Sequence, residues 1–513
     1  MATLIGVDHK FAMKKIINTL PRLSLNRRSI LLPLILLLGL FFRLYALGGE
    51  SLWLDEAISI RNAKLNFLQI SFGYFNTPPL YYIFLHWWTS IFGFSEFAVR
   101  LPSVIFGVLS LLIIYEVGNL LFDSDTGRLS SMLMAFSVFH IQFSQEARTY
   151  SLSVLLTLLS MYYFIKLIKR ENYQVVIGYI LSSILLMYSH IYGLFVIIAQ
   201  NIYFIGVFFF SMSGEKLNRT KWIVIQSTLI VLFSPWVGIF ISQVRSVQKD
   251  FWIPKSDIST VASTFLTYAS GFRVLLYLFL VLLAFSFISI ENKRIGVKET
   301  FPFSSLKNSR WKIRLFSEGE VVFLFIWLIT PIVLPFIISQ FSQPIYFTKY
   351  TIVASSAFIL LVARGIRNLA SKSVKSIAIS IVIALSLISI IGYHAKIKKE
   401  QWREVAKYVD TNARSGDVVL FNAPYCMVPF NLYSHGDFTK RGFPESVRPL
   451  EENDITTLRQ IAEHYGRIWL ILSHNKKNKE LIVKTLIKYY HLSYSQHFKG
   501  IRLYLFEKGE TPV

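Results

Sequence analysis

Long apolar stretches alternate with short polar ones over most of this chain. A helix needs about 20 apolar residues to cross the hydrocarbon layer of a membrane, so each long stretch predicts a membrane helix. The pattern predicts about 11 such helices. The stretches lie at residues 29–47, 98–121, 129–143, 151–168, 175–190, 191–211, 222–241, 274–290, 321–339, 351–363 and 376–393. We therefore expect a polytopic α-helical membrane domain over residues 29–393.

Lys and Arg residues recur in every second loop between these stretches. Cytoplasmic loops carry an excess of such residues, so these loops are expected inside. Residues 1–28 then form a cytoplasmic N-terminus, and an odd number of helices places the C-terminal segment outside. Arg43 lies near a helix end, from which its side chain is expected to reach the interface. The basic loops contain Lys14, Lys15, Arg22, Arg27, Arg28, Lys166, Lys169, Arg170, Lys216, Arg219, Lys221, Lys293, Arg294, Lys298, Arg364, Arg367, Lys372 and Lys375.

The composition agrees with a membrane protein. Hydrophobic residues make up 53% of the chain and charged residues only 16%, whereas a soluble domain carries about a quarter charged residues. The net charge of +23 is one that nucleic-acid-binding proteins show. Here the basic residues lie in short loops between apolar stretches, so we expect membrane lipids and no nucleic acid as partners. The single cysteine, Cys426, excludes an intramolecular disulfide and a Cys-rich metal site.

The first predicted outer loop, residues 48–97, is long and rich in aromatic residues. The run Asn76-Thr77-Pro78-Pro79 within it interrupts helical geometry. Aromatic residues favour the membrane interface, so the stretches on either side predict short helices that lie in that interface.

The composition changes from about residue 394 onward. Charged residues become frequent, and short apolar strands at 418–421, 468–472 and 501–506 alternate with helical patterns. This alternation predicts a small extracytoplasmic α/β domain over residues 394–513.

Candidate chemistry gathers in the outer loops. Asp55 and Glu56 follow the first helix, and acids at membrane depth are costly and tend to be functional. Adjacent helical residues diverge by about 100°, so the two acids are expected to have different roles. The alternative is that both simply begin an interfacial helix, where carboxylates complement the helix dipole.

Two further outer segments contain acids and cations. Glu146 and Arg148 lie at the outer end of the third stretch. They are expected either to contact other segments as a pair or to form a solvated turn at the interface. Lys349 and Tyr350 precede an apolar stretch, where a cation can meet a phosphate, although a snorkelling Lys and an interfacial Tyr are equally common there. Arg100 begins the second helix outside and could act similarly. All three segments are predicted to lie on the same face of the membrane, which favours a functional site at that face.

Several motifs resemble those of a known family. They are Leu52-Trp53-Leu54-Asp55-Glu56-Ala57, Thr77-Pro78-Pro79-Leu80-Tyr81-Tyr82, Ser95 to Ser103, Ser144-Gln145-Glu146-Ala147-Arg148-Thr149-Tyr150 and Trp402-Arg403-Glu404-Val405-Ala406. These motifs are similar to those of the GT-C glycosyltransferases, in particular the protein mannosyltransferase-like and ArnT-like branch.

The resemblance implies a GT-C fold and transfer of a sugar from a polyprenyl-phosphate donor at the outer face of the cytoplasmic membrane. It implies a catalytic base at Asp55, assisted by Glu146 or Glu56. Arg148, Lys349 and Arg100 are expected to bind the donor phosphate, with Tyr350, Trp53, Tyr81 and Tyr82 lining the site. Lys349 stands where relatives commonly have Arg, so it keeps the charge but not the bidentate geometry.

Several properties remain open at the level of sequence. No cofactor is required, because cationic side chains can neutralise the phosphate; a divalent ion held by Asp55 and Glu146 is the alternative. The acceptor is a lipid, a glycan or a protein, and the sugar is not specified. The competing function is a transporter or flippase of a lipid-linked sugar, which predicts interrupted helices and polar residues at mid-depth.

Overall fold

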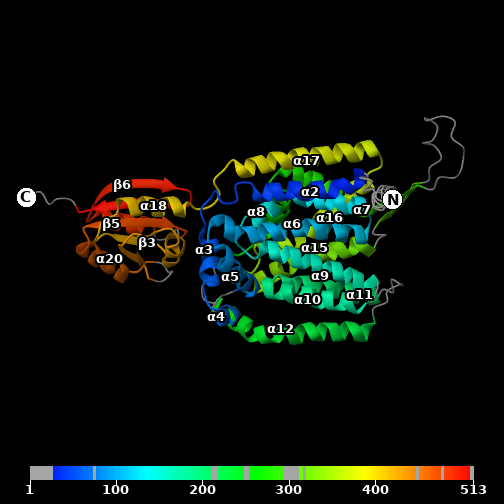
Figure 1. Ribbon diagram of the computed structural model, residues 1–513, viewed down its shortest axis with the longest axis horizontal. Coiled ribbons are helices and arrows are strands. Elements are labelled where there is room, and N and C mark those ends of the chain that lie inside the picture. Colours follow the sequence, from blue (N-terminus) through cyan, green and yellow to red (C-terminus); the bar gives the residue numbers. More distant parts are fainter. Residues whose placement is uncertain are drawn as a thin grey trace, which may run out of the picture.

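The computed structural model describes residues 27–72, 77–169, 172–209, 218–247, 253–292, 311–315, 319–445, 450–474 and 479–508. Figure 1 shows two parts, a bundle of long helices that run roughly side by side and a smaller part of strands and helices at one end of the bundle. Residues 1–26 of the predicted N-terminal segment 1–28, together with Asn76 and several of the basic loop residues, lie outside the described residues.

The bundle consists of helices that follow the apolar stretches closely. Within the described residues, six helices are long and apolar enough to cross a membrane, or seven if one bent pair forms a single span, and three shorter apolar helices accompany them. The chain is therefore a multi-pass helical membrane protein. The helices are α2 (Arg27–Leu44), α6 (Glu96–Leu121), α7 (Ser124–Ala135), α8 (Val138–Ser144), α9 (Tyr150–Lys169), α10 (Tyr173–Ser189), α11 (Gly193–Phe209), α12 (Arg219–Val247), α13 (Ile258–Tyr268), α14 (Arg273–Ser286), α15 (Gly319–Phe341), η1 (Thr348–Thr351), α16 (Ile352–Asn368) and α17 (Lys372–His394).

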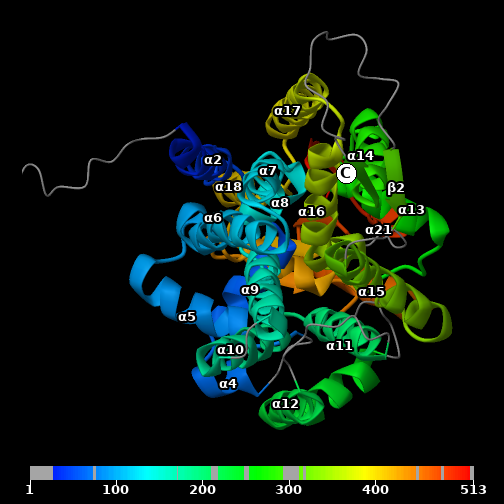
Figure 2. The same cartoon turned by 90° about the vertical axis from the view of Figure 1, so that its right-hand side faces the viewer.

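Helices α6, α9 and α16 occupy the middle of the bundle, and α12 and α17 lie at its edges (Figure 2). The burial of the helices follows this arrangement. The apolar windows of α9 and α16 are 78% and 83% buried, whereas those of α12 and α17 are only 22% buried. The edge helices therefore present most of their apolar surface outward, where a lipid environment can cover it.

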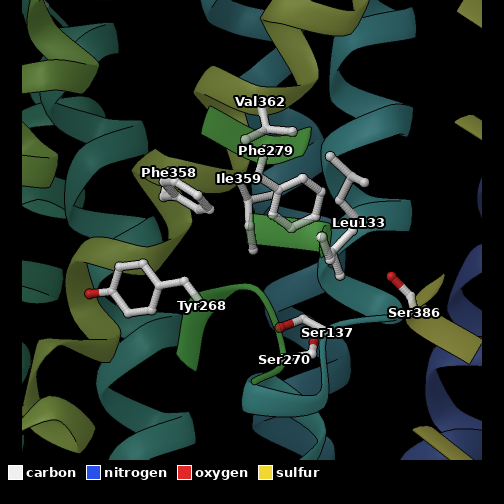
Figure 3. A pocket seen from close by; sticks show the side chains of 10 residues that line it. Leu133, Ser137, Tyr268, Ser270, Phe279, Phe358, Ile359, Val362 and Ser386 are labelled. Atoms are coloured by element: carbon white, nitrogen blue, oxygen red, sulfur yellow. The ribbon is translucent and has the colours of Figure 1, made fainter. Parts of the chain in front are cut away.

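Two helices are interrupted inside the bundle. The apolar stretch 129–143, predicted as one helix, is divided at Phe136–Ser137 into α7 and α8. Helices α13 and α14 meet at 90°, where Ser270 and Gly271 adopt positive φ angles of 58° and 75°. The interruptions touch, because Ser270 Oγ accepts a hydrogen bond from the Val138 backbone at 3.2 Å. A pocket beside this contact is lined mainly by apolar side chains and by Ser137, Ser270 and Ser386 (Figure 3).

Arg43 corrects one expectation from the sequence. Its side chain does not reach the interface but is completely buried. The guanidinium donates to the carbonyls of Gly39 at 3.0 Å, Ala135 at 3.4 Å and Met134 at 3.3 Å, and to Ser144 Oγ at 3.2 Å. Backbone carbonyls at the end of an interrupted helix need hydrogen-bond partners in a membrane, and Arg43 donates to those of Met134 and Ala135.

Short helices form the first loop at the end of the bundle that faces the smaller part (Figure 1). They are α3 (Leu54–Ala63), α4 (Phe67–Ser71) and α5 (Leu80–Phe92). Ser95 caps the following helix, since its side chain accepts a hydrogen bond from the Ala98 backbone. The cap marks the point at which the loop ends and the long helix α6 begins.

The C-terminal part contains a five-stranded sheet in the order β4-β3-β5-β7-β6. Strand β3 is parallel to β4 and β5, while β7 is antiparallel to β5 and β6. Alternate residues of β3 enter two different apolar clusters, one on each face of the sheet, which is typical of a sheet covered on both faces. The elements are α18 (Trp402–Asn412), β3 (Val418–Phe421), η2 (Pro424–Cys426), α19 (Met427–Phe430), β4 (Thr439–Gly442), α20 (Glu452–His464), β5 (Arg467–Ser473), α21 (Lys479–Ile487), β6 (His491–Phe498) and β7 (Ile501–Glu507), and a separate two-stranded sheet joins β1 (Ile288–Asn292) to β2 (Trp311–Leu315).

The two parts contact each other through the first loop. Helix α19 packs against α3. The Leu52 backbone donates to the Tyr433 hydroxyl at 2.7 Å, and Tyr433 donates to Glu96 at 3.0 Å. Glu96 also forms an ion pair of 3.0 Å with Arg403 on α18. The C-terminal part is thus held against the loop that contains the candidate acids.

Candidate active site

Asp55 lies in the first turn of α3 and forms an ion pair with Lys349. The distance between Lys349 Nζ and Asp55 Oδ2 is 3.0 Å, and the two side chains are 15% and 25% exposed respectively. Burial tends to raise the pKa of Asp55, but the positive charges of Arg148 and Lys349 outweigh it, and the pKa lies below its usual value. The carboxylate is therefore ionised and accessible.

Aromatic rings surround the Lys349 ammonium. Its Nζ lies 5.2 to 5.8 Å from the ring centroids of four residues: Trp53, Tyr150, Phe347 and Tyr350. Cations are attracted to ring faces at such distances, more strongly where water is excluded. The predicted lining residues Trp53 and Tyr350 thus lie against the cation, and the Tyr350 ring stacks on Tyr150 at 6.3 Å.

Arg148 joins the same group from the turn before α9. Its Nη1 donates to the Asp55 carbonyl at 3.2 Å and to Ser59 Oγ at 3.1 Å. The Tyr82 hydroxyl also accepts from Nη1, at 3.5 Å. Arg148 Nε is buried and has no hydrogen-bond partner within the described ranges. The guanidinium therefore has a buried donor, Nε, that no described residue accepts from.

Glu56 has a different environment from its neighbour. Its carboxylate is buried and accepts two hydrogen bonds of 2.8 Å from Arg100, one of 2.9 Å from the Ala147 backbone and one of 3.0 Å from Lys399. Burial alone would raise its pKa, but Arg100 and Lys399 lower it to about 2. Glu56 ties α3 to α6 and to the turn before α9, which supports a structural role.

Arg100 has no donor left for a phosphate. Its five N–H groups bind Glu56 twice and the carbonyls of Leu47, Glu50 and Ser51. The sequence had suggested Arg100 as a phosphate ligand; the geometry instead makes it the partner that fixes Glu56.

Glu146 lies in the turn between α8 and α9 and is almost completely buried. Its Oε1 accepts from the Gln142 amide at 3.3 Å, and its Oε2 has no hydrogen-bond partner among the described residues. Burial raises the pKa of Glu146, although Lys399 opposes this effect. The predicted acid is thus close to the cluster but less accessible than Asp55.

The two tyrosines of the loop occupy different positions. Tyr81 is completely buried in the apolar core, with its ring edge toward Tyr82 at 5.8 Å. Tyr82 is also buried, but its hydroxyl reaches Arg148 and accepts from Thr77 Oγ1 at 3.2 Å. Tyr82 therefore contacts Arg148 directly, while Tyr81 packs against the Tyr82 ring.

Lys399 is a member of the cluster that the sequence analysis missed. It lies between α17 and α18, outside the recognised motifs, and its ammonium contacts Glu56. A signal was present, because Lys396, Lys398 and Lys399 form a basic group in a segment that the sequence predicts to lie outside, where Lys and Arg are less frequent.

Within the described ranges, no group of three or more His, Cys, Asp and Glu side chains is placed to hold a metal ion. The accessible charges are instead the carboxylate of Asp55 and the cations of Lys349 and Arg148. Such an arrangement can accept a proton and stabilise a phosphate in one place.

The sequence and the fold were compared with known proteins. Residues 76–239 match the family model of dolichyl-phosphate-mannose-protein mannosyltransferases. No curated protein matches the sequence significantly. Crystal structures of ArnT from Cupriavidus metallidurans share the fold: the apo state has a TM-score of 0.59 at 9% identity, covering 94% of this chain and 98% of that chain. The state bound to undecaprenyl phosphate has a TM-score of 0.55 at 8% identity, covering 92% and 97%.

A second solved structure has a related architecture. The archaeal oligosaccharyltransferase AglB from Archaeoglobus fulgidus, in complex with an inhibitory peptide and a dolichol-phosphate, has a TM-score of 0.54 at 10% identity. It covers 96% of this chain and 75% of that chain. The shared fold extends over nearly the whole chain, and the family model covers the segment with Tyr82, Glu146 and Arg148. The chain therefore shares its fold with these solved membrane proteins, and its residues 76–239 are similar to the protein mannosyltransferase family.

Proposed function

We propose that the protein transfers a sugar from a polyprenyl-phosphate donor to an acceptor hydroxyl at the outer face of the cytoplasmic membrane. The observation that carries this proposal is the Asp55–Lys349 ion pair of 3.0 Å, with Arg148 bound to the Asp55 backbone. Three segments distant in sequence thus place one carboxylate and two cations together. The ArnT and AglB structures contain undecaprenyl phosphate and a dolichol-phosphate, which supports a polyprenyl phosphate as the carrier.

The proposed reaction is a single displacement. The acceptor oxygen attacks the anomeric carbon, the bond from that carbon to the phosphate oxygen breaks, and the acceptor proton passes to Asp55. The products are the glycosylated acceptor and polyprenyl phosphate. Attack opposite the leaving group inverts the anomeric centre, as in one-step glycoside chemistry.

Donor binding would activate Asp55 in this mechanism. In the free protein, Arg148 and Lys349 hold the pKa of Asp55 low despite its burial, so the carboxylate is a weak base. A donor phosphate would bind the same cations and neutralise part of their charge. The pKa of Asp55 then rises toward the range in which it accepts a proton.

The leaving phosphate needs charge stabilisation and no protonation. Lys349 supplies a charge held among four aromatic rings, and Arg148 supplies a buried Nε donor without a partner in the described structure. Trp53, Tyr82 and Tyr350 would line the boundary between the polyprenyl chain and the sugar. No cofactor is needed in this scheme.

The same proposal fixes the orientation in the membrane. About 11 spans would place residues 1–28 inside and residues 394–513 outside, as an extracytoplasmic domain. The catalytic loop 48–97 then faces outward, beside that domain. The acceptor, whether lipid, glycan or protein, would approach from this side.

The test is sugar transfer by purified variants with a polyprenyl-phosphate sugar as donor. Asp55→Asn removes the base, and the rate is expected to fall about 10²–10⁴-fold. Lys349→Ala removes phosphate stabilisation and should weaken donor binding as well. Asp437→Asn, at an exposed position of the C-terminal part, serves as the control with full activity. Full activity in both site variants would overturn these roles.

A transporter of a lipid-linked sugar is the second candidate. Interrupted helices are a feature of transporters, and two interruptions meet where Val138 contacts Ser270. The two functions differ in their products. Release of free polyprenyl phosphate from the donor supports the enzyme, whereas movement of intact donor across vesicles supports the transporter.

A further inference from the structure

The segment that joins α17 to α18 is fixed in the candidate site by the first outer loop. The backbone N–H groups of Lys398 and Lys399 both donate to the Glu50 carboxylate, at 3.0 and 3.1 Å. Ser51 Oγ donates to the Glu400 carbonyl at 2.6 Å. These three contacts involve three consecutive residues of the segment, so the first outer loop specifies the path of the segment.

The Lys399 ammonium lies between Glu56 and the turn that contains Glu146. It donates to Glu56 Oε1 at 3.0 Å and to the Gln145 carbonyl at 2.8 Å, and the side chain is only 12% exposed. Gln145 precedes Glu146 in the turn, and its own amide donates to the Arg43 and Tyr45 carbonyls. Lys399 therefore holds one side of the turn from which Glu146 projects.

Lys399 is a cation close to the Glu146 carboxyl group. Its ammonium binds the carbonyl of the preceding residue, Gln145, at 2.8 Å, and its charge opposes the rise that burial causes in the pKa of Glu146. Glu56 and Arg100 neutralise each other as a buried pair. Lys349 and Glu56 act on Glu146 from other segments, and Gln142 donates to it. The hydroxyls of Tyr150 and Tyr393 also face it. A buried carboxylate without a compensating cation binds a proton instead of staying ionised.

We propose that Lys399 is a positioning residue that fixes the Glu146 turn and places a positive charge beside the Glu146 carboxyl group. The segment between α17 and α18 then belongs to the catalytic site. Packing of the C-terminal part against the first outer loop completes that site. The relevance to catalysis rests on the proposed function, in which Glu146 assists the base.

The ionisation of Glu146 can be measured directly by infrared difference spectroscopy of the full-length protein. The band of its protonated carboxyl group is assigned as the one that Glu146→Gln removes. In Lys399→Met the midpoint of this band is expected to move by about one to two pH units to higher pH. An unchanged midpoint would overturn the proposal.

Two further variants separate charge from packing. Lys399→Gln keeps a donor for the Gln145 carbonyl and loses the charge, so its midpoint should move as in Lys399→Met; it also replaces Lys399→Met should that variant fold poorly. Lys398→Met is the matched control, because the Lys398 side chain lies over the Tyr393 ring at 3.0 Å and only its backbone binds Glu50. Its midpoint should equal that of the unmodified protein.

Activity supplies an independent readout. The acid limb of the sugar-transfer rate should move to higher pH in Lys399→Gln, and Lys399→Arg, which retains the charge, should restore much of the profile. Absence of transfer by the unmodified protein would contradict the proposed function, while the infrared midpoints still decide the role of Lys399. A moved limb with an unmoved midpoint would overturn the assignment to Glu146.

Discussion

Two adjacent acids on α3 differ in their surroundings more than in their chemistry. Asp55 is a quarter exposed and pairs with one cation, Lys349, whereas Glu56 is completely buried and accepts five hydrogen bonds. The 100° between neighbouring helical residues turns one toward the loop exterior and the other toward α6. The acid proposed as the catalytic base, Asp55, is accordingly the one with fewer partners.

Replacing Glu56 should therefore affect stability first. Glu56→Gln leaves Arg100 buried without its counter-charge, and loss of one partner of a buried pair costs about 3–5 kcal/mol. Unfolding of the purified protein in detergent measures this loss. Asp55→Asn is the matched control at the next position, and it should reduce activity with little change in the unfolding midpoint. Equal stability of the two variants would contradict the division of roles.

The sign of the pH dependence follows from the same carboxylate. The folded-state pKa of Glu56 is lowered to about 2 from an ordinary 4.5, so the folded state binds the proton less readily than the unfolded state. Its stabilisation is fully present above pH 4.5 and is lost as the pH falls toward 2. The Gln variant lacks this contribution, so its stability should depend less on pH across that window.

The sequence predicted which charged residues gather in the outer loops. It did not predict which of them form ion pairs with each other. Asp55, Arg148 and Lys349 could be placed on one membrane face because topology alone determines the face. Which of them pair depends on tertiary distances, so Arg100 was assigned to a phosphate although it binds Glu56. Lys399 was missed because it belongs to no motif.

At the scale of elements, close helix packing depends on small residues. A Cβ added at Gly365 of α16 would lie only 1.7 Å from the Leu282 carbonyl oxygen of α14. That atom belongs to the backbone and cannot move aside as a flexible side chain would. Small residues allow helix backbones to approach each other in membranes, and Gly365 marks such an approach.

Gly365→Ala is expected to destabilise the protein by about 1–3 kcal/mol or more through overpacking. Gly392→Ala on α17 is the matched control, because its Cβ would meet nothing within 4 Å and Ala favours a helix by about 0.5–1 kcal/mol. Thermal unfolding in detergent compares the two. The unfolding midpoint should fall for Gly365→Ala only. Equal midpoints for the two variants would contradict a close backbone approach of α14 and α16 at Gly365.

Most of the long helices were predictable from the sequence, because the apolar stretches are long and their flanks are charged, whereas α13 corresponds to no predicted stretch. The interruptions of the helices were not predictable. The stretch 129–143 contains no Pro, Gly, Lys, Arg or acidic residue, and Ser137 is a common residue inside membrane helices, so nothing local separates α7 from α8. The break persists because Arg43, distant in sequence, accommodates the carbonyls of Met134 and Ala135.

At the scale of the whole molecule, the candidate site lies between two structural parts. Arg403 pairs with Glu96, and Tyr433 binds Leu52, so the C-terminal part contacts the catalytic loop directly. Figure 1 shows this part beyond the end of the bundle at which α3 lies. Function therefore requires that the loop and the C-terminal part lie on the same side of the membrane.

Single-cysteine labelling of intact cells tests that side. In a Cys426→Ser background, Lys499→Cys introduces an exposed thiol in the turn between β6 and β7, and Lys372→Cys introduces one at the start of α17. A membrane-impermeant maleimide should label the first without permeabilisation and the second only after it. Helix α17 lies between the two positions and is long enough to cross the membrane, so they should lie on opposite sides. The reverse labelling pattern would place the catalytic loop inside and remove the proposed outer-face transfer.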